Sequence, residues 1–202
     1  MNYLGKRLFD IVGSILALLA FSPLFILLSV LILITDGRPI FYRQNRIGKG
    51  GKMFRIIKFR SMYKDADKIL KSNPAIYQKY LENDYKLPEG EDPRITKIGR
   101  ILRKTSLDEL PQFINVLKGD MSLVGPRPIV PEELREYGEK KNEFLLMKPG
   151  ITGIWQVSGR SELKYPERTR VELKYMQVQS FSYDLRVLYK TVNCVFKRQG
   201  AF

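Results

Sequence analysis

The sequence predicts a mainly α-helical fold with one small β-hairpin, led by a broken hydrophobic helix at the N-terminus. Three observations support this: an almost wholly apolar run covers residues 11–34, two strand-like segments flank a glycine-rich turn near residue 50, and apolar residues recur at helical spacing in later segments. At 202 residues, the chain is long enough for one domain with a real core. We expect residues 1–37 to form a membrane helix-break-helix and residues 38–202 to form a cytosol-facing domain.

The apolar run from Ile11 to Ile34 would be about 36 Å long as one helix, which is enough to span a bilayer. Its centre contains Ser22-Pro23, and a proline can divide the helix into two pieces of roughly 16 Å each, neither of which could cross. Basic residues flank both ends, which favours a cytoplasmic location for both; these are Lys6, Arg7, Arg38, Arg43 and Arg46. We therefore expect a re-entrant hairpin, with a kinked span, a cleaved signal peptide and a buried core helix as the alternatives.

The next segment predicts a β-hairpin followed by a polar insertion. Residues 39–42 and 54–59 have strand composition, and Gly48-Lys49-Gly50-Gly51 separates them. These glycines are not spaced as in a nucleotide-binding loop, so a turn is the better interpretation. Residues 65–92 are polar, with helical tendency at 66–71 and 75–81, and we interpret them as an insertion or lid over a site.

Two short basic amphipathic helices follow. Ile98, Ile101 and Leu102 recur at helical spacing among four basic residues, and residues 185–196 repeat this pattern. Taken alone, each pattern is typical of a helix with one face on the core. Together with an N-terminal membrane segment, however, the two patterns favour helices that lie at the membrane interface.

Composition limits the chemistry that is available. The formal charge of +14 favours anionic partners, which include nucleic acid, anionic lipid and phosphorylated substrates. The chain contains no histidine, which excludes Ser-His-Asp and Cys-His nucleophiles and the usual histidine-containing zinc sites. The single cysteine, Cys194, lies in an apolar run and cannot form an internal disulfide, so we interpret it as a packing residue in a reducing, cytosol-facing environment.

Asp108 and Glu109 stand at the start of a predicted helix that closes near residue 119. A structural role would explain them, because Ser106 and Glu109 have capping-box spacing and the helix dipole favours acids there. Pro111 argues against Ser106 as the N-cap, because the proline would then fall where an intrahelical hydrogen bond should form. A helix that starts near Asp108 instead places Pro111 in the first turn, where proline is tolerated. A carboxylate at that start is expected to have a lowered pKa and to face a pocket that attracts phosphate. Adjacent helical positions diverge by about 100°, which implies different roles, such as one nucleophile and one magnesium ligand.

Two later loops carry candidate binding residues. Arg127 lies between Pro126 and Pro128, so the backbone is restricted and a preorganised guanidinium is offered to phosphate, although a stiff surface turn explains it equally well. The glycine-punctuated loop of residues 148–160 carries Gln156 and Arg160, which could hydrogen-bond a base or a phosphate.

Taken in order, these motifs resemble the bacterial sugar transferases, or monotopic phosphoglycosyl transferases, which initiate capsule, exopolysaccharide and glycoprotein glycan assembly. The matching segments cover nearly the whole chain: residues 6–10, 22–23, 39–43, 58–62, 106–112, 115–122, 125–128 and 148–160. The resemblance implies that Ser22-Pro23 breaks a re-entrant membrane helix, that Asp108 is a covalent nucleophile and that Glu109 helps to hold Mg²⁺.

The resemblance also implies a phosphate-binding site formed by Arg127, Arg103 and the strand of Lys58 and Arg60. Glu172 departs from the family, which usually has aspartate there, and residues 177–182 match it loosely. Asp184 nevertheless matches a recurring family acid. The substrate-binding candidates are therefore Lys58, Arg60, Arg103, Arg127, Pro128, Gln156, Arg160 and Asp184.

From this resemblance we expect an enzyme of the bacterial cytoplasmic membrane that faces the cytosol. It would move a sugar-1-phosphate from a UDP-sugar to polyprenyl (undecaprenyl) phosphate, release UMP, and so perform the first membrane step of polysaccharide or glycoconjugate synthesis. The insertion at 65–92 resembles that of members using UDP-galactose or UDP-glucose. The oligomeric state is open, with a homodimer as one option.

Two rival functions use the same features. A membrane-tethered protein could bind nucleic acid or lipid through its positive charge, but no nucleic-acid-binding motif is present, so we expect no nucleic-acid partner. A glycosidase would need two carboxyl groups across a glycosidic bond, for which the adjacent Asp108 and Glu109 are poorly placed.

Overall fold

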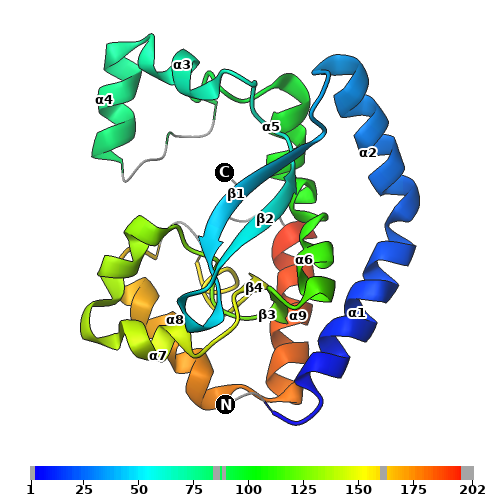
Figure 1. Ribbon diagram of the computed structural model, residues 1–202, viewed down its shortest axis with the longest axis vertical. Helices are drawn as coiled ribbons and strands as arrows, with labels where there is room; N and C mark the ends of the chain where they lie inside the picture. Colours follow the sequence, from blue (N-terminus) through cyan, green and yellow to red (C-terminus); the bar gives the residue numbers. More distant parts are fainter. Residues whose placement is uncertain (1–2, 84–86, 88–89, 160–162, 197–202) are drawn as a thin grey trace.

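The computed structural model describes residues 3–83, 87, 90–159 and 163–196. Helices dominate this part of the chain, and two small two-stranded sheets lie between them (Figure 1). The helices α1 (Lys6–Ala20) and α2 (Ser22–Thr35) run along one side of the molecule. A mainly α-helical fold with a small hairpin is thus confirmed.

The break between α1 and α2 falls at the predicted position. The two helices are bent by 62° relative to each other, with Pro23 in the first turn of α2, where its missing N–H is tolerated. The Ser22 hydroxyl donates to the Leu19 carbonyl at 2.8 Å and satisfies an end group of α1. Among the described residues, no single helix is long and apolar enough to cross a membrane, whereas the bent pair meets that length and composition together.

The predicted hairpin is formed by β1 (Phe41–Ile47) and β2 (Met53–Phe59), which pair antiparallel. The first strand starts two residues later than predicted and continues to Ile47. Between the strands lies the short 3₁₀ turn η1 (Lys49–Gly51), in which Gly50 has a φ of 69°. Tyr42 is opposite Lys58 and Arg46 is opposite Phe54, so these side chains share one face of the hairpin.

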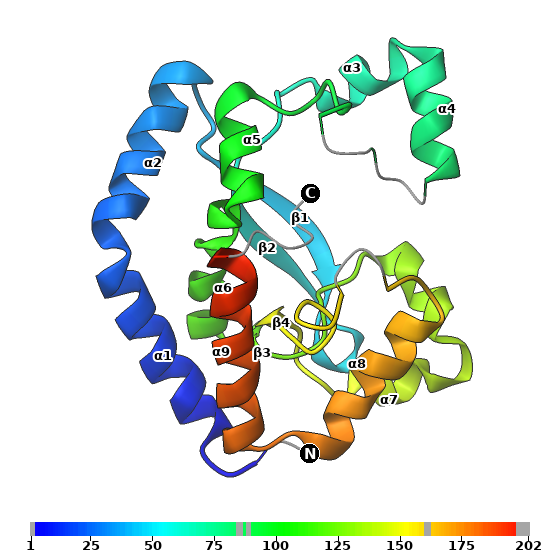
Figure 2. The ribbon, with the colours of Figure 1, turned by 180° about the vertical axis from the view of Figure 1, so that it is seen from behind.

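The insertion contains the two predicted helices, α3 (Ala66–Lys71) and α4 (Pro74–Glu82). They pack on each other and stand at one end of the molecule, away from α7 and α8 (Figures 1 and 2). The Arg94 guanidinium lies 4.8 Å from the centre of the Tyr80 ring and joins α4 to the segment that leads into α5. A lid function for this insertion stays a prediction.

The centre of the chain forms α5 (Lys97–Lys104), the 3₁₀ turn η2 (Leu107–Glu109) and α6 (Gln112–Lys118). Gly119, with a φ of 90°, closes α6 as predicted. Helix α6 packs along α1 and behind the hairpin.

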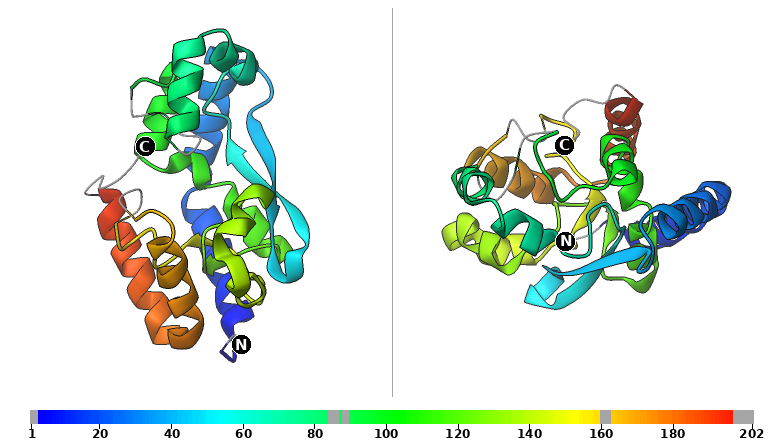
Figure 3. Two further views of the ribbon diagram at one scale, coloured as in Figure 1. Left: turned by 90° about the vertical axis from the view of Figure 1, so that its left-hand side faces the viewer. Right: turned by 90° about the horizontal axis from the view of Figure 1, so that it is seen from above.

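The C-terminal half contains elements that were not predicted. Strand β3 (Ser122–Val124) pairs parallel with β4 (Gly150–Thr152). The backbones approach so closely that a Cβ on Gly125 would lie 2.4 Å from the Lys148 carbonyl oxygen, which explains the glycine. Three further elements, η3 (Pro131–Lys140), α7 (Lys141–Leu145) and α8 (Glu167–Val178), were also not predicted, whereas α9 (Phe181–Phe196) confirms the helix predicted at residues 185–196. Helices α8 and α9 meet where the Tyr175 hydroxyl donates to Asp184 at 2.7 Å, and the right-hand view of Figure 3 shows that they otherwise lie apart.

Buried polar contacts attach both ends of the bent pair to the rest of the protein. At the start of α1, Lys6 forms an ion pair with Asp184 of α9, and Asp10 accepts hydrogen bonds from the Ser122 hydroxyl at 2.9 Å and the Leu123 N–H at 3.0 Å. Just after the end of α2, Arg60 Nη2 donates to the carbonyl oxygens of Asp36 and Gly37, and in the first turn of α2 Phe25 packs against Phe59 of β2 with ring centres 4.8 Å apart. The pair is therefore a fixed part of the fold.

Candidate active site

The two predicted catalytic carboxylates lie in η2, between α5 and α6. Ser106 has a φ of 58° and makes no side-chain capping bond, so the capping-box interpretation is wrong. Helix α6 begins only at Gln112, and Pro111 occupies its N-cap position. Asp108 and Glu109 therefore precede the helix instead of forming its first turn, and helix capping does not explain them.

Burial sets the ionisation of Asp108. The residue is only 8% exposed, and this loss of solvent raises its pKa from 3.8 to about 6, even though the Lys58 ammonium, 3.9 Å away, acts in the opposite direction. The negative charge of Glu109 adds to the rise and the charge of Arg103 opposes it. The predicted lowering of this pKa is wrong, because Asp108 lacks the expected place in the first turn of a helix and desolvation dominates.

Lys58 lies beside both carboxylates, and the charge of Arg103 acts on Asp108. The Lys58 ammonium lies 2.7 Å from Glu109 Oε1. Lys58 is on β2, opposite Tyr42 of β1. Arg103 comes from the last turn of α5 and donates from Nε to the Ser61 hydroxyl at 3.0 Å. Burial lowers the pKa of Arg103, and the charge of Asp108 opposes that effect.

Arg60 and Asp184 are engaged elsewhere in the fold. Arg60 Nη2 donates to the carbonyl oxygens of Asp36 at 2.6 Å and Gly37 at 2.8 Å, and so holds the end of α2. Asp184 is 0% exposed and accepts hydrogen bonds from Lys6 and from the Tyr175 hydroxyl, the latter at 2.7 Å. These contacts give both residues a role in joining the bent helix pair to the domain.

The Pro-Arg-Pro segment lies against the far end of β1. The Pro128 carbonyl accepts from Arg46 Nη1 at 3.2 Å, and the Arg127 guanidinium lies 3.5 Å from Glu133 and 5.5 Å from the centre of the Trp155 ring. Gln156 donates to the Ile151 carbonyl at 3.4 Å within its own loop. Arg160 lies outside the described residues.

Sequence reasoning missed Arg46 and Glu133 as candidate site residues. The alternation of side chains along β1 carried the signal for Arg46, because residues 42, 44 and 46 face the same side of the hairpin as Lys58. Arg46 had been considered only as a flanking charge of the membrane segment.

Glu109 is the candidate magnesium ligand. Its side chain is 36% exposed, so this carboxylate is accessible from solvent. Magnesium is usually bound by one or two carboxylates together with substrate phosphates and water, a role that Glu109 fits. The described part of the chain contains no group of three or more metal-binding side chains.

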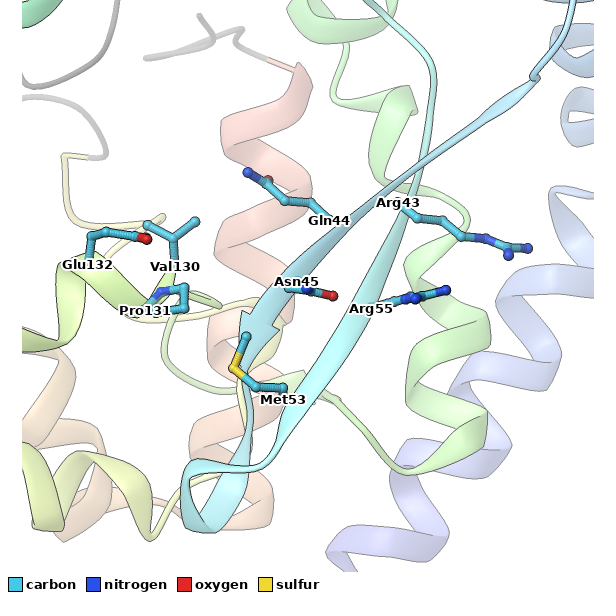
Figure 4. Close-up of a pocket in the computed structure, with 8 residues that line it drawn as sticks. All are labelled: Arg43, Gln44, Asn45, Met53, Arg55, Val130, Pro131 and Glu132. Carbon is cyan, nitrogen blue, oxygen red and sulfur yellow. The ribbon is translucent and has the colours of Figure 1, made fainter.

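A cavity of about 610 Å³ lies beside the hairpin (Figure 4). Its lining residues are Arg43, Gln44, Asn45, Met53, Arg55, Val130, Pro131 and Glu132. None of the predicted site residues is among them, so the cavity is separate from the carboxylate pair.

Comparison with known proteins identifies the family. The model of the family described as bacterial sugar transferase matches residues 1–198. The chain is 48% identical over 200 residues to the undecaprenyl-phosphate galactose phosphotransferase of Salmonella typhimurium, covering 98% of this chain and 41% of that protein. It is 43% identical over 203 residues to the exopolysaccharide production protein ExoY of Sinorhizobium fredii, covering 98% and 88%.

A third relative is the UDP-glucose:undecaprenyl-phosphate glucose-1-phosphate transferase of Escherichia coli, which is 37% identical over 212 residues. The match covers all of this chain and 42% of that protein, so the chain spans most of ExoY and less than half of the other two relatives. The family match over nearly its whole length, together with these identities, shows that the protein belongs to the bacterial sugar transferase family.

Proposed function

We propose that this protein transfers a sugar-1-phosphate from a UDP-sugar to undecaprenyl phosphate through a phosphosugar intermediate on Asp108, and releases UMP. The observation that carries the proposal is a buried carboxylate, Asp108, held beside the positive charges of Lys58 and Arg103. The names of the Salmonella and Escherichia relatives support UDP-galactose or UDP-glucose as the donor.

The reaction proceeds in two displacements at one phosphorus atom. A carboxylate oxygen of Asp108 forms a bond to the sugar-bearing phosphorus, the bond from that phosphorus to the bridging oxygen breaks, and UMP leaves with the electron pair. A phosphate oxygen of undecaprenyl phosphate then attacks the same phosphorus and releases the Asp108 carboxylate. Lys58 and Arg103 offset the negative charge on the phosphoryl group, which is the main requirement in phosphoryl transfer.

The pKa of Asp108 suits the first displacement. With a pKa of about 6, the carboxyl group is mostly ionised at neutral pH and can act as a nucleophile. Its basicity is higher than that of an exposed aspartate, which favours attack once the site is closed to water.

We assign Glu109 to magnesium binding. Its exposed carboxylate stands next to the position where the phosphates of the donor would lie. Magnesium bound there would neutralise charge on those phosphates. In the structure, Lys58 pairs with Glu109 and holds the carboxylate in place.

We further propose that the bent pair α1–α2 enters the cytoplasmic membrane and returns, which leaves the domain on the cytosolic side. Helix α1 buries polar residues, among them Lys6, Asp10 and Ser14, against the protein. Large apolar residues on both helices are exposed instead, which is the reverse of a water-facing helix; they include Leu8, Val12, Leu16, Leu19, Ile26, Leu27 and Ile34. This arrangement suits an enzyme whose donor is water-soluble and whose acceptor has its phosphate at the membrane surface.

Exposed apolar residues on two further helices support contact with the interface. Ile101 projects from α5 among basic residues, and α9 exposes Leu185, Tyr189 and Val192 along one side. We therefore assign the protein to the first membrane step of polysaccharide or glycoconjugate assembly.

Intact-protein mass spectrometry tests the mechanism directly. Wild-type protein incubated with UDP-galactose or UDP-glucose, without acceptor, should gain the mass of one sugar phosphate on the peptide that contains Asp108, and added undecaprenyl phosphate should remove it. Asp108→Asn should gain no mass. An adduct in that variant, or on another residue of the wild type, would refute the assignment.

A further inference from the structure

The insertion of residues 65–92 leaves and rejoins the domain through a stem of two adjacent segments, residues 60–63 and 94–96. Two backbone hydrogen bonds, of 2.9 and 3.1 Å, join these segments, and an antiparallel bridge lies between them. One segment continues β2 and the other leads into α5, which Figures 1 and 2 show at the same end of the molecule as α3. The stem therefore connects the insertion to the strand and the helix that carry Lys58 and Arg103.

The start of α5 packs directly on the stem. The Thr96 hydroxyl caps the helix by accepting from the Gly99 N–H at 2.9 Å, and no space is left for a Cβ on Gly99 against the Ser61 carbonyl. One turn later, Arg103 Nε donates to the Ser61 hydroxyl at 3.0 Å. Ser61 is 7% exposed, so this hydrogen bond is shielded from water. A single stem residue thus contacts the backbone of α5 and also fixes the direction of its arginine.

A buried ion pair closes the stem on the side of the insertion. Asp92 and Arg94 are 6% and 8% exposed, and Arg94 Nε and Nη2 donate to the two carboxylate oxygens of Asp92 at 2.8 and 2.7 Å. The Arg94 N–H donates to the same carboxylate at 3.0 Å. Because the guanidinium also lies against the Tyr80 ring of α4, the pair fastens the insertion to the stem.

Arg103 lies in the field of two carboxylates, Asp108 and Asp92. Burial lowers the pKa of Arg103, and both negative charges oppose that effect; Tyr42 acts with them and Arg94 against them. Negative and positive groups therefore alternate from the proposed nucleophile to the insertion, in the order Asp108, Arg103, Asp92 and Arg94. The charge of Arg103 is shared between the stem and the active site.

We propose that Ser61 and Asp92 are positioning residues that hold Arg103 beside Asp108, with Arg94 fixing Asp92 and linking the insertion to the active site. A long arginine side chain loses conformational entropy when it is ordered, and the stem imposes that order before the donor binds. A preorganised charge then stabilises the transition state without moving during the reaction. This inference rests on the proposed function and deepens it, because Arg103 acts there on the phosphoryl group.

Ser61→Ala removes the hydroxyl that holds Arg103. In detergent-solubilised full-length protein with saturating UDP-galactose or UDP-glucose, adduct formation should slow about three- to tenfold, the range expected for one lost hydrogen bond. The donor concentration at half saturation should change less. Ser61→Thr keeps a hydroxyl and should restore most of the rate. Ser72→Ala is the matched control, because it removes an exposed serine hydroxyl from the insertion and should react at the wild-type rate.

The dependence on Arg103 separates positioning from a purely structural role. In an Arg103→Gln background, Ser61→Ala should cause no further loss of rate, because the group that the hydroxyl positions is gone. A structural role of Ser61 predicts the same fold loss in both backgrounds, and that result would overturn the proposal. A wild-type rate in Ser61→Ala itself would overturn it as well.

Asp92 is tested together with Arg94, because removal of one charge alone would leave the other buried and unpaired. Asp92→Asn combined with Arg94→Gln should slow adduct formation at saturating donor, and this loss should again disappear in the Arg103→Gln background. Lys79→Gln combined with Glu91→Gln removes an exposed ion pair of the same insertion and should react like the wild type. If the first variant fails to fold, Asp92→Glu, which displaces the carboxylate, is measured with the same expectation. A wild-type rate in the folded variant would overturn the role of Asp92.

Chemical labelling tests the position of Arg103 without catalysis. Phenylglyoxal modifies accessible guanidinium groups, and it should react several-fold faster with Arg103 in Ser61→Ala than in the wild type, as measured by the mass of the peptide. Arg100 is exposed on the same helix and should react equally in both proteins, which makes it an internal control. Equal reactivity of Arg103 in both proteins would overturn the proposal whatever their activity. Absence of adduct and of UMP release in the wild type would refute the proposed function, but the labelling result would still decide whether Ser61 holds Arg103.

Discussion

Asp108→Asn should stabilise the fold while it abolishes turnover. The carboxyl group of Asp108 is buried, and its pKa rises from 3.8 to about 6. Keeping this group ionised at neutral pH therefore costs roughly 3 kcal/mol of the free energy of unfolding, since each pKa unit corresponds to about 1.4 kcal/mol. Asparagine has nearly the same shape and no charge, so the variant avoids this cost, whereas the loss of a structural carboxylate would destabilise the protein.

The effect should depend on pH in a defined direction. The folded-state pKa is above the unfolded value, so the folded protein binds more protons between about pH 4 and pH 6, and the free energy of unfolding falls as the pH rises through that window. The asparagine side chain of the variant does not titrate. The free energy of unfolding of the variant should thus exceed that of the wild type only slightly near pH 4, and by the full amount above about pH 7.

Thermal unfolding of the purified protein in detergent measures this difference. For a chain of this length, 1 kcal/mol shifts Tm by about 2–4 °C, so the variant should melt about 6–12 °C higher at pH 7.5 at most. Asp65→Asn is the control, because the Asp65 side chain is 68% exposed and should show no such shift. A variant that is equally or less stable than the wild type at pH 7.5, with the same pH dependence, would refute the reasoning.

Four further outcomes are expected. Lys58→Gln removes the charge that holds down the pKa of Asp108, so the acid limb of the pH profile for adduct formation should move to higher pH; an unchanged limb would contradict the role of Lys58. Glu109→Gln should weaken the dependence of rate on Mg²⁺, and an identical magnesium titration would return Glu109 to a structural role. Arg127→Lys should lower kcat/KM by roughly 1–3 kcal/mol of transition-state stabilisation, while unaltered kinetics would point to a surface turn. Pro23→Leu should favour a continuous helix, as measured by labelling of the termini in vesicles; a native N-terminus on the outer face would exclude re-entry.

The stabilising effect expected for Asp108→Asn follows from the burial of the Asp108 carboxyl group. In the mechanism that we propose, this burial lowers the stability of the fold, as is common for active-site groups. The same burial would raise the basicity of the proposed nucleophile and keep water from the reacting phosphorus.

Features that depend on local geometry were predictable from the sequence alone. The break before Pro23 follows from a missing N–H, the hairpin turn from Gly50 at positive φ, and the end of α6 from Gly119, because in each case one residue limits its own backbone. Motif order was enough to single out Asp108 and Glu109, and in the structure Lys58 lies 3.9 Å from the first and 2.7 Å from the second.

The environments of these side chains could be learned only from the packed fold. Sequence suggested a lowered pKa for Asp108, but packing of distant segments desolvates the carboxyl group and raises it. Asp184 pairs with Lys6, which is 178 residues away, Arg60 binds a carbonyl 24 residues away, and Glu133 forms ion pairs with arginines from three segments. Local sequence limits backbone conformation, whereas burial and charge pairing depend on which segments meet in space, and that is set by the whole fold.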